Sequence, residues 1–192
     1  MGFFYGTEAF PQNAPQILWN VTQVRFKYPS ENTIEGHQYA LEMQIVMNDT
    51  LNRALFCTAH KGVLSLFFDV GDTQDDDFWS FAGQEGDFKF DLSKVFDKTT
   101  AIQSEMFGFM GTDSQPECDN GYCWYLNVPG TGATVSRTIT AETLEKLKYT
   151  KADGTILEGN NRKVNPLAAG KPVFNYKSTG LFYTAPTSDS QN

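Results

Sequence analysis

The sequence is poor in the side chains that most often bind transition metals. Its 192 residues include two histidines, His37 and His60, and neither has a second histidine at the spacing of a strand or helix metal site. The three cysteines, Cys57, Cys118 and Cys123, lack the second pair that a zinc-finger spacing requires. These residues alone predict no metal site. They predict one disulfide and one free thiol, or a thiol whose partner lies outside the chain, and they leave His37 as an exposed turn residue.

Long apolar runs and clusters of basic residues are also absent. The longest apolar runs, such as Val63 to Phe68, are far shorter than the roughly 20 residues that span a membrane. With 15 Lys and Arg against 23 Asp and Glu, the net charge of -8 argues against a nucleic-acid-binding surface. The opening residues MGFFYG match neither a signal peptide nor, because of Gly6, a myristoylation signal. The composition therefore predicts neither a membrane span nor nucleic-acid binding.

Aromatic residues are plentiful, and the pattern of apolar residues indicates a sheet. The 16 Phe and 8 Tyr favour strands, and 192 residues suffice for one domain with a sizeable core. Ile17 to Tyr28 and Tyr39 to Met47 alternate like neighbouring antiparallel strands, whereas Val63 to Val70 is apolar almost throughout, as in a central strand. We predict a mainly β (α+β) fold with a central, largely antiparallel, twisted sheet and a few short peripheral helices.

Two short segments have the residues of a helix start. Asp75 to Asp77 precede Phe78 and Trp79, so they predict either a helix N-terminus, where the dipole favours carboxylates, or a solvated acidic loop. Thr140 to Lys148 has a threonine at the N-cap position, a glutamate in the first turn and an i, i+3 leucine pair, which predicts a short helix.

The segment Gln23 to Met47, QVRFKYPSENTIEGHQYALEMQIVM, carries the most specific pattern in the chain. It resembles the zinc-binding centre of the α-class carbonic anhydrases, in which a strand Q-F-H-F-H is followed by S-E-H-T-I/V-D-G and by E-L/M-H-L/I-V-H. Three further segments resemble the same family in the same order: Gly62 to Asp72, Gly111 to Trp124 and Asn160 to Leu167. The resemblance covers Ile17 to Tyr183, and the family's N-terminal third, with its proton-shuttle histidine, has no counterpart.

The resemblance places Arg25, Lys27 and Gln44 where the family has its three zinc-binding histidines. Zinc takes neutral imidazoles, thiolates or carboxylates, whereas Arg25 and Lys27 are cationic and offer only hydrogen-bond donors. Because side chains two apart on a strand share a face, both would project into the metal's place and repel a dication. The resemblance therefore implies a catalytically silent relative that carries no zinc and needs no cofactor.

The resemblance also identifies the remaining positions of the former active site. In the family, the glutamate matching Glu42 hydrogen-bonds a ligand histidine, and the one matching Glu31 orients a hydroxyl that here is matched by Ser114. Asp113 replaces a leucine of the apolar carbon dioxide wall. The remnant pocket would consist of Gln23, Glu31, Glu42, Val63, Asp113, Ser114, Gln115 and Trp124.

A buried charge is tolerated only when it is paired, so the two cations at the ligand positions need counter-charges. We predict that Glu42, Glu31 or Asp113 neutralises Arg25, Lys27 or both in an internal salt-bridge cluster. The alternative is that the two cations bind a small anion such as bicarbonate.

Two classes of function remain. The preferred one is a non-catalytic carbonic-anhydrase-like domain that serves as a structural or binding subunit, because a fold without its first third would expose apolar surface and strand edges for other protein subunits to cover. The alternative is a hydrolase using Ser114, or a small-anion-binding protein. We expect residues 1–16 to be a partner contact, 17–183 the carbonic-anhydrase-like domain and 184–192 a polar tail. The partners would form a homo-oligomer or a hetero-complex.

Cysteines and sequons suggest where the protein resides. In the family, the partner of the cysteine matching Cys118 lies in the N-terminal third, so the resemblance leaves Cys118 with Cys123 or with Cys57. Sequons begin at Asn20 (NVT) and Asn48 (NDT) and predict N-glycosylation in a secreted protein. We therefore expect an extracellular location or the lumen of a secretory organelle.

Overall fold

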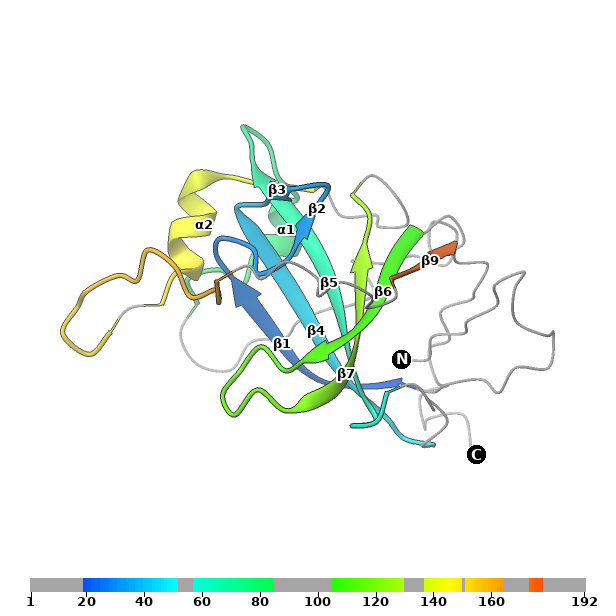
Figure 1. The fold of residues 1–192 in the computed structure, drawn as a ribbon. Helices are drawn as coiled ribbons and strands as arrows, with labels where there is room; N and C mark the ends of the chain where they lie inside the picture. The colour runs from blue at the N-terminus through cyan, green and yellow to red at the C-terminus, as the bar shows by residue number, and fades with distance from the viewer. Residues whose placement is uncertain are drawn as a thin grey trace, which may run out of the picture.

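The structure is a computed structural model that describes residues 19–51, 57–84, 105–129, 137–149, 151–163 and 173–177. The expected partner contact 1–16 and the polar tail 184–192 lie outside these residues. In chain order the elements are β1 (Trp19–Lys27), β2 (Thr33–Ile34), β3 (His37–Gln38), β4 (Leu41–Asp49), β5 (Lys61–Val70), α1 (Asp76–Trp79), β6 (Glu105–Thr112), β7 (Asn120–Asn127), β8 (Thr138–Ile139), α2 (Ala141–Leu147) and β9 (Phe174–Lys177) (Figure 1).

Most strands join one twisted sheet in the order β1-β4-β5-β7-β6-β9, with β8 added to β5 (Figure 1). Neighbours are antiparallel except where β5 pairs with β7 and with β8. The predicted mainly β fold with a largely antiparallel central sheet is therefore confirmed. The strands predicted from alternation correspond to β1, β4 and β5, each within two or three residues of its expected bounds inside the described ranges.

The central strands β4 and β5 are buried on both faces, which explains their apolar sequences. Alternation sends Met43, Ile45 and Met47 of β4 into one apolar cluster, on the side of α1. The opposite face of the same strand carries Val46 in a second apolar cluster and, toward the start of the strand, two buried polar side chains, Glu42 and Gln44. The polar residues of interest are thus held by the most buried part of the sheet.

Both predicted helices are present. In α1 the side chain of Asp75 accepts a hydrogen bond from the Phe78 N–H at 3.0 Å, and Phe78 and Trp79 are buried. The alternative of a solvated acidic loop is wrong, because the two aromatic residues bury the segment against the sheet. In α2 the Thr140 hydroxyl accepts from the Thr143 N–H at 3.3 Å, as its N-cap position predicts.

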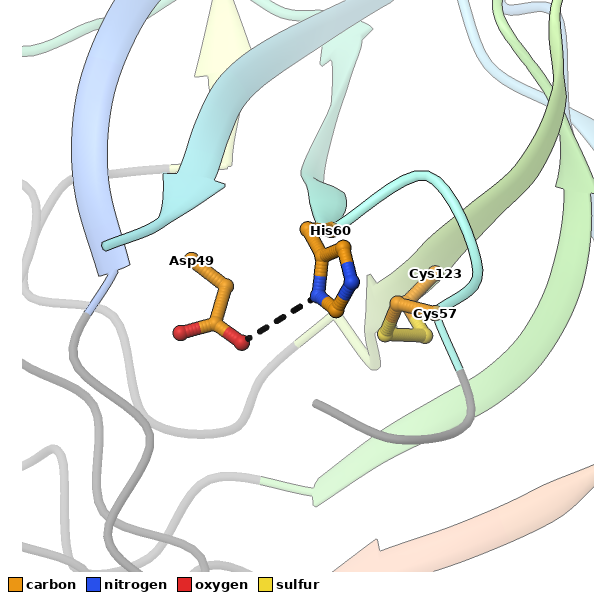
Figure 2. Close-up of a disulfide and its surroundings, with 4 residues drawn as sticks. All are labelled: Asp49, Cys57, His60 and Cys123. Carbon is orange, nitrogen blue, oxygen red and sulfur yellow. Dashed lines mark ion pairs between the residues drawn. A yellow bond between two sulfur atoms is a disulfide. The ribbon is translucent and has the colours of Figure 1, made fainter. Parts of the chain in front are cut away.

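The disulfide joins Cys57 to Cys123, so both pairings expected for Cys118 are wrong (Figure 2). The parallel pairing of β5 with β7 sets Gly62 beside Cys123, and the segment leading into β5 brings Cys57 within a Cα–Cα distance of 5.2 Å. Cys118 lies in the turn before β7, where it is a free, half-buried thiol. The Cys57–Cys123 pairing could not be predicted from the sequence, because it depends on the β5–β7 contact, which joins segments about 60 residues apart.

The two histidines lie in different surroundings. His37 is exposed as predicted, but it belongs to the short strand β3, and its Nε2 lies 3.1 Å from the Asp69 carboxylate. His60 lies beside the disulfide, with its Nδ1 3.8 Å from the buried carboxylate of Asp49 (Figure 2). The two rings are therefore held by separate acids rather than by a common site.

Candidate functional site

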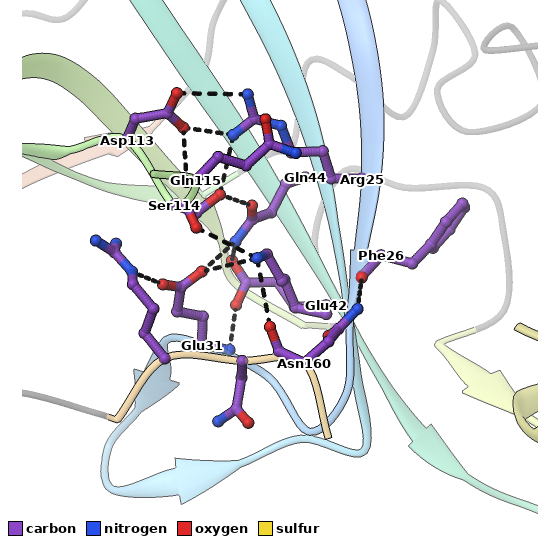
Figure 3. A network of polar contacts seen from close by, with 12 residues as sticks. Arg25, Phe26, Glu31, Glu42, Gln44, Asp113, Ser114, Gln115 and Asn160 are labelled. Atoms are coloured by element: carbon purple, nitrogen blue, oxygen red, sulfur yellow. Dashed lines mark hydrogen bonds and ion pairs between the residues drawn. The ribbon is translucent and has the colours of Figure 1, made fainter. Parts of the chain in front are cut away.

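The three positions of the expected zinc ligands converge on one face of the β1–β4 pair. Arg25 and Lys27 are two residues apart on β1, and the strand register sets Arg25 opposite Gln44 on β4. The side chains of Arg25 and Gln44 point into a buried polar cluster (Figure 3). Lys27 reaches the same cluster, because its Nζ donates to the Ser114 carbonyl. Gln44 is fully buried and the Lys27 side chain is 11% exposed, so this cluster is part of the interior.

Arg25 is paired with Asp113, which lies just after β6. The guanidinium forms an ion pair with the Asp113 carboxylate, donates to Ser114 Oγ at 3.0 Å through Nη1, and donates to Gln23 Oε1 at 2.9 Å through Nε. The Asp113 carboxylate also accepts from the Tyr122 hydroxyl at 3.0 Å. Burial alone would raise the pKa of Asp113, but Arg25 and the hydrogen bonds of its neighbours hold it below its usual value.

Gln44 and Ser114 fill the centre of the cluster and satisfy each other. The Ser114 hydroxyl donates to Gln44 Oε1 at 2.7 Å while it accepts from Arg25. The Gln44 amide nitrogen donates to Glu42 Oε1 at 3.1 Å and to Glu31 Oε2 at 3.3 Å. Both polar atoms of the amide and the serine hydroxyl are therefore engaged, which leaves Ser114 without the features of an activated nucleophile.

Among the described residues Glu42 pairs with no cation, so of the three acids predicted as counter-charges Asp113 and Glu31 take that role. Its carboxylate accepts five hydrogen bonds from neutral donors: the N–H groups of Glu31 and Asn32 at 2.8 and 2.9 Å, the Asn32 amide at 2.8 Å, the Gln44 amide at 3.1 Å and the Ser65 hydroxyl at 2.7 Å. Because these donors surround both oxygens, the charge is dispersed without a salt bridge. Sequence reasoning missed the turn after β1 that supplies the two N–H groups.

Lys27 is held more loosely than Arg25. Its Nζ donates to the Ser114 carbonyl at 3.3 Å and to the Asn160 carbonyl at 3.5 Å, and it lies 4.0 Å from Glu31 Oε2. Glu31 has a second cationic partner in Arg162, which also donates to Thr112 Oγ1 at 3.1 Å. The structure therefore divides the counter-charges, with Asp113 against Arg25 and Glu31 between Lys27 and Arg162.

Sequence reasoning missed Asn160 and Arg162 as members of the site. The Asn160 side chain donates to the Phe26 carbonyl at 2.9 Å (Figure 3). It also accepts from the Tyr28 N–H at 2.9 Å, so it fixes this segment to the end of β1. The signal was present in the matched segment Asn160 to Leu167, of which residues 164–167 lie outside the described residues.

The cluster carries equal numbers of positive and negative groups. Three cationic side chains face three carboxylates within it: Arg25, Lys27 and Arg162 against Glu31, Glu42 and Asp113. Each charge is bound by an opposite charge or by several hydrogen bonds. The arrangement therefore resembles an internal ionic network more than an anion-binding site, which would need a cation without a partner.

The other predicted pocket residues lie around this network. Val63 and Trp124 are buried in the apolar cluster on the same face, and the Trp124 ring N–H donates to the Thr112 carbonyl at 3.0 Å. Gln115 is exposed, and its N–H donates to Asp113 at 3.3 Å. Gln23 is exposed as well. Within the described ranges, no three His, Cys, Asp or Glu side chains are grouped so that they could hold a metal ion.

Comparison with known proteins shows likeness to carbonic anhydrases in sequence and in fold. No protein-family model matches the chain. A carbonic anhydrase of Neisseria gonorrhoeae is 26% identical over 155 residues, which are 79% of this chain and 54% of that protein. The chain thus spans about half the length of this curated relative.

Solved structures agree with this likeness. The α-carbonic anhydrase of Thermovibrio ammonificans, solved with sulfanilamide, is 25% identical with a TM-score of 0.57, over 82% of this chain and 63% of that one. Carbonic anhydrase Cah3 of Chlamydomonas reinhardtii is 16% identical with a TM-score of 0.64, over 82% and 65%. Dioscorin in complex with ascorbate is 18% identical with a TM-score of 0.57, over 84% and 64%.

The part of the chain that the structure describes contains no helix long and apolar enough to cross a bilayer. The resemblance first indicated by the segment around Arg25 is borne out by the sheet, by the sequence relative and by the structural neighbours. In sequence and in fold the chain is similar to the α-carbonic anhydrases.

Proposed function

We propose that the chain is a non-catalytic carbonic-anhydrase-like domain that serves as a structural or binding subunit of a larger assembly. The observation that carries this proposal is the identity and bonding of the residues at the expected ligand positions. Arg25 and Lys27 place two cations there, and Gln44 has both polar atoms engaged. A dication would need three unprotonated ligands and an open position for water in the same space.

Binding zinc here would require the network to be dismantled first. Displacing Arg25 would leave Asp113 without its cation, and displacing Gln44 would leave the Ser114 hydroxyl without an acceptor. Leaving a buried or partly buried group without its partner destabilises the folded state. The network therefore opposes the metal by its bonding as well as by its charge.

Exposed apolar side chains support the second half of the proposal. Met110 on β6 is 49% exposed, and Val173, next to β9, is 45% exposed, so both lie at the end of the sheet away from β1. Apolar groups gathered at one place on a surface favour contact with another protein. Residues 1–16, whose aromatic start FFY also favours burial against a partner, are proposed as a further contact.

The first experiment measures metal and activity. Protein equilibrated with excess zinc and then desalted should contain no stoichiometric zinc and should not accelerate carbon dioxide hydration. An active α-carbonic anhydrase carried through the same steps is the control for metal loss. Near one zinc per chain, or hydration above the buffer rate, overturns the non-catalytic half of the proposal.

The second experiment measures assembly. The chain should co-purify with other subunits from its native source, or form a homo-oligomer by light scattering at micromolar concentration. Met110→Lys with Val173→Lys should weaken that association. The control variant Gln115→Lys, which also places a lysine at an exposed position, should not. A wild-type monomer that binds no hydrophobic dye overturns the assembly half while leaving the zinc result unaffected.

The alternative is a small-anion-binding protein, and one comparison favours it. Dioscorin, a protein of the same fold, is solved in complex with ascorbate. The balanced charges of the cluster argue against such a site here, because each cation already has an acceptor. Calorimetric titration with bicarbonate and with ascorbate tests it, and binding that Arg25→Met abolishes would favour the alternative. The hydrolase reading is weaker, since Ser114 contacts Gln44 and Arg25 rather than a base.

The disulfide supports the expected compartment. Disulfides form and persist in extracellular and secretory environments, and the Cys57–Cys123 bond is buried in the sheet. We therefore propose an extracellular or secretory-lumen location, which fractionation of the native source would test.

A further inference from the structure

The two sequons of the chain meet at one place in the fold. Asn20 lies on β1 and Asn48 on β4, and the register of the two antiparallel strands sets these asparagines directly opposite each other. Both are exposed. We infer that Asn20 and Asn48 form a single N-glycosylation patch, and that its glycan covers the outer edge of β1, the last strand of the sheet among the described residues.

The local geometry is suited to both acceptors. The residue after each asparagine points inward, since Val21 is half-buried and the Asp49 side chain is fully buried. The alternation of the strands therefore turns both asparagine side chains toward solvent. Thr22 and Thr50, the third residues of the two sequons, are exposed as well. Asn20 lies five residues before Arg25, or roughly 16 Å along the strand, so a glycan would not disturb the ionic network.

The outer edge of β1 gives this patch a consequence. Within the described residues β1 is the last strand of the sheet, and an open edge strand invites pairing with another chain. Asn160 closes one end of this edge through the Phe26 carbonyl and the Tyr28 N–H. A bulge between Val21 and Gln23 interrupts its middle. The remaining end, around Asn20, is the part that a glycan would cover.

The compartment agrees with this chemistry. N-linked glycans are added to Asn-X-Ser/Thr in the secretory pathway, and the buried disulfide indicates an oxidising environment of the same kind. This inference is independent of the proposed function, because it rests on the end of the β1–β4 pair opposite the ionic network. A glycosylated chain could equally hold or lack zinc, so the glycan-mass test and the zinc test fail separately.

The first test is the mass of the secreted protein. The full chain, expressed behind a secretion signal in insect or mammalian cells, should lose glycan mass on treatment with peptide-N-glycosidase F. The same treatment should convert Asn20, Asn48 or both to aspartate, as peptide mass spectrometry would show. Asn20→Gln with Asn48→Gln should abolish the shift, whereas Asn161→Gln, which lies outside any sequon, should not. A secreted chain with an intact disulfide and no glycan at either site overturns the inference.

The second test separates the glycan from its effect on the edge. Asn20→Gln with Asn48→Gln, which removes the glycan without leaving the aspartates that enzymatic removal produces, should increase self-association in light scattering at least several-fold. Thr22→Val in the Asn48→Gln background removes both sequons while keeping Asn20, and it should self-associate in the same way. Thr22→Lys in that background also removes both sequons but adds an edge charge that opposes pairing, so it should stay dispersed. If the glycosylated wild type and all glycan-free variants scatter alike, the glycan does not cover the edge.

Discussion

Two carboxylates of the buried cluster, Glu42 and Asp113, are stabilised in contrasting ways. Glu42 is fully buried and accepts five hydrogen bonds from neutral donors. Asp113 lies nearer the surface, and its main partner is the guanidinium of Arg25. A carboxylate surrounded by oriented donors keeps most of its hydrogen bonds whatever occupies the neighbouring position, whereas one held by a single cation depends on that cation.

This contrast separates two layers of the buried cluster. The layer around Glu42 is built from the main chain after β1 and from Ser65 on β5, so the fold itself supplies it. The layer around Asp113 is built from side chains at the positions where the resemblance places zinc ligands and the substrate wall. We expect mutations in the first layer to affect folding, and mutations in the second layer to affect charge and metal binding.

The largest expected effect is the creation of a zinc site in the second layer. Arg25→His, Lys27→His and Gln44→His together should bind close to one zinc per chain by elemental analysis, because the three positions share one face of paired strands and Glu42 can accept from an imidazole N–H. Carbon dioxide hydration need not follow, since Asp113 and Gln115 still place polar side chains where the resemblance places the substrate wall.

The control for this variant removes the same charges without adding ligands. Arg25→Ala, Lys27→Ala and Gln44→Ala should bind no zinc. A triple-histidine protein that folds normally, yet holds no more zinc than wild type, shows that the register assigned to the ligand positions is wrong.

The next largest effect is expected from the first layer. Glu42→Ala should lower the free energy of unfolding by about 3 to 4 kcal/mol, because several buried donors lose their acceptor at once and each costs on the order of 1 to 3 kcal/mol before relaxation. The matched control is Glu142→Ala, since that carboxylate is exposed on α2, and its urea midpoint should hardly move. If the urea midpoint of Glu42→Ala equals that of Glu142→Ala, the hydrogen bonds to Glu42 do not stabilise the fold.

Some of this arrangement could be predicted from the sequence, and the reason is local. Alternation and caps depend on neighbouring residues, so β1, β4, β5, α1 and α2 were predictable, as was the shared face of Arg25 and Lys27. The Cys57–Cys123 bond and the contacts of Arg162 depend on how distant segments meet. The five donors to Glu42 depend on the path of a turn. No residue pattern within a single segment encodes those contacts.

An intermediate effect is expected for the pair in the second layer. Arg25→Met should destabilise the protein by about 2 kcal/mol, since it leaves the Asp113 carboxylate partly buried without its cation. Asp113→Asn in the same background should recover part of this loss. A double-mutant cycle by urea unfolding measures the coupling, and a coupling near zero would mean that the ion pair contributes nothing to stability.

Acidification should weaken the same pair. Burial raises the pKa of Asp113, but Arg25, Tyr122 and the Gln115 N–H lower it further than burial raises it, so the folded pKa lies below the unfolded one. Such a group contributes stability above its unfolded pKa, about 3.9, and loses it as the pH falls through the folded value. Wild type should therefore lose more unfolding free energy than Asp113→Asn below pH about 4. If the two proteins lose the same free energy of unfolding as the pH falls, the pKa of Asp113 is not lowered in the folded state.

The smallest effect is expected at Lys27, although it too is a buried cation. Its Nζ contacts are long, at 3.3 and 3.5 Å to two carbonyls and 4.0 Å to Glu31, and Glu31 keeps Arg162 and Gln44 when Lys27 is changed. Replacing a loosely paired buried ion by an apolar side chain of similar volume is often close to neutral. Lys27→Met should therefore change the free energy of unfolding by less than about 1 kcal/mol in either direction, and by less than Arg25→Met measured in parallel. A loss of about 3 kcal/mol or more would identify Lys27 as the principal counter-charge of Glu31. Glu31 would then not be shared between Lys27 and Arg162 as its contacts indicate.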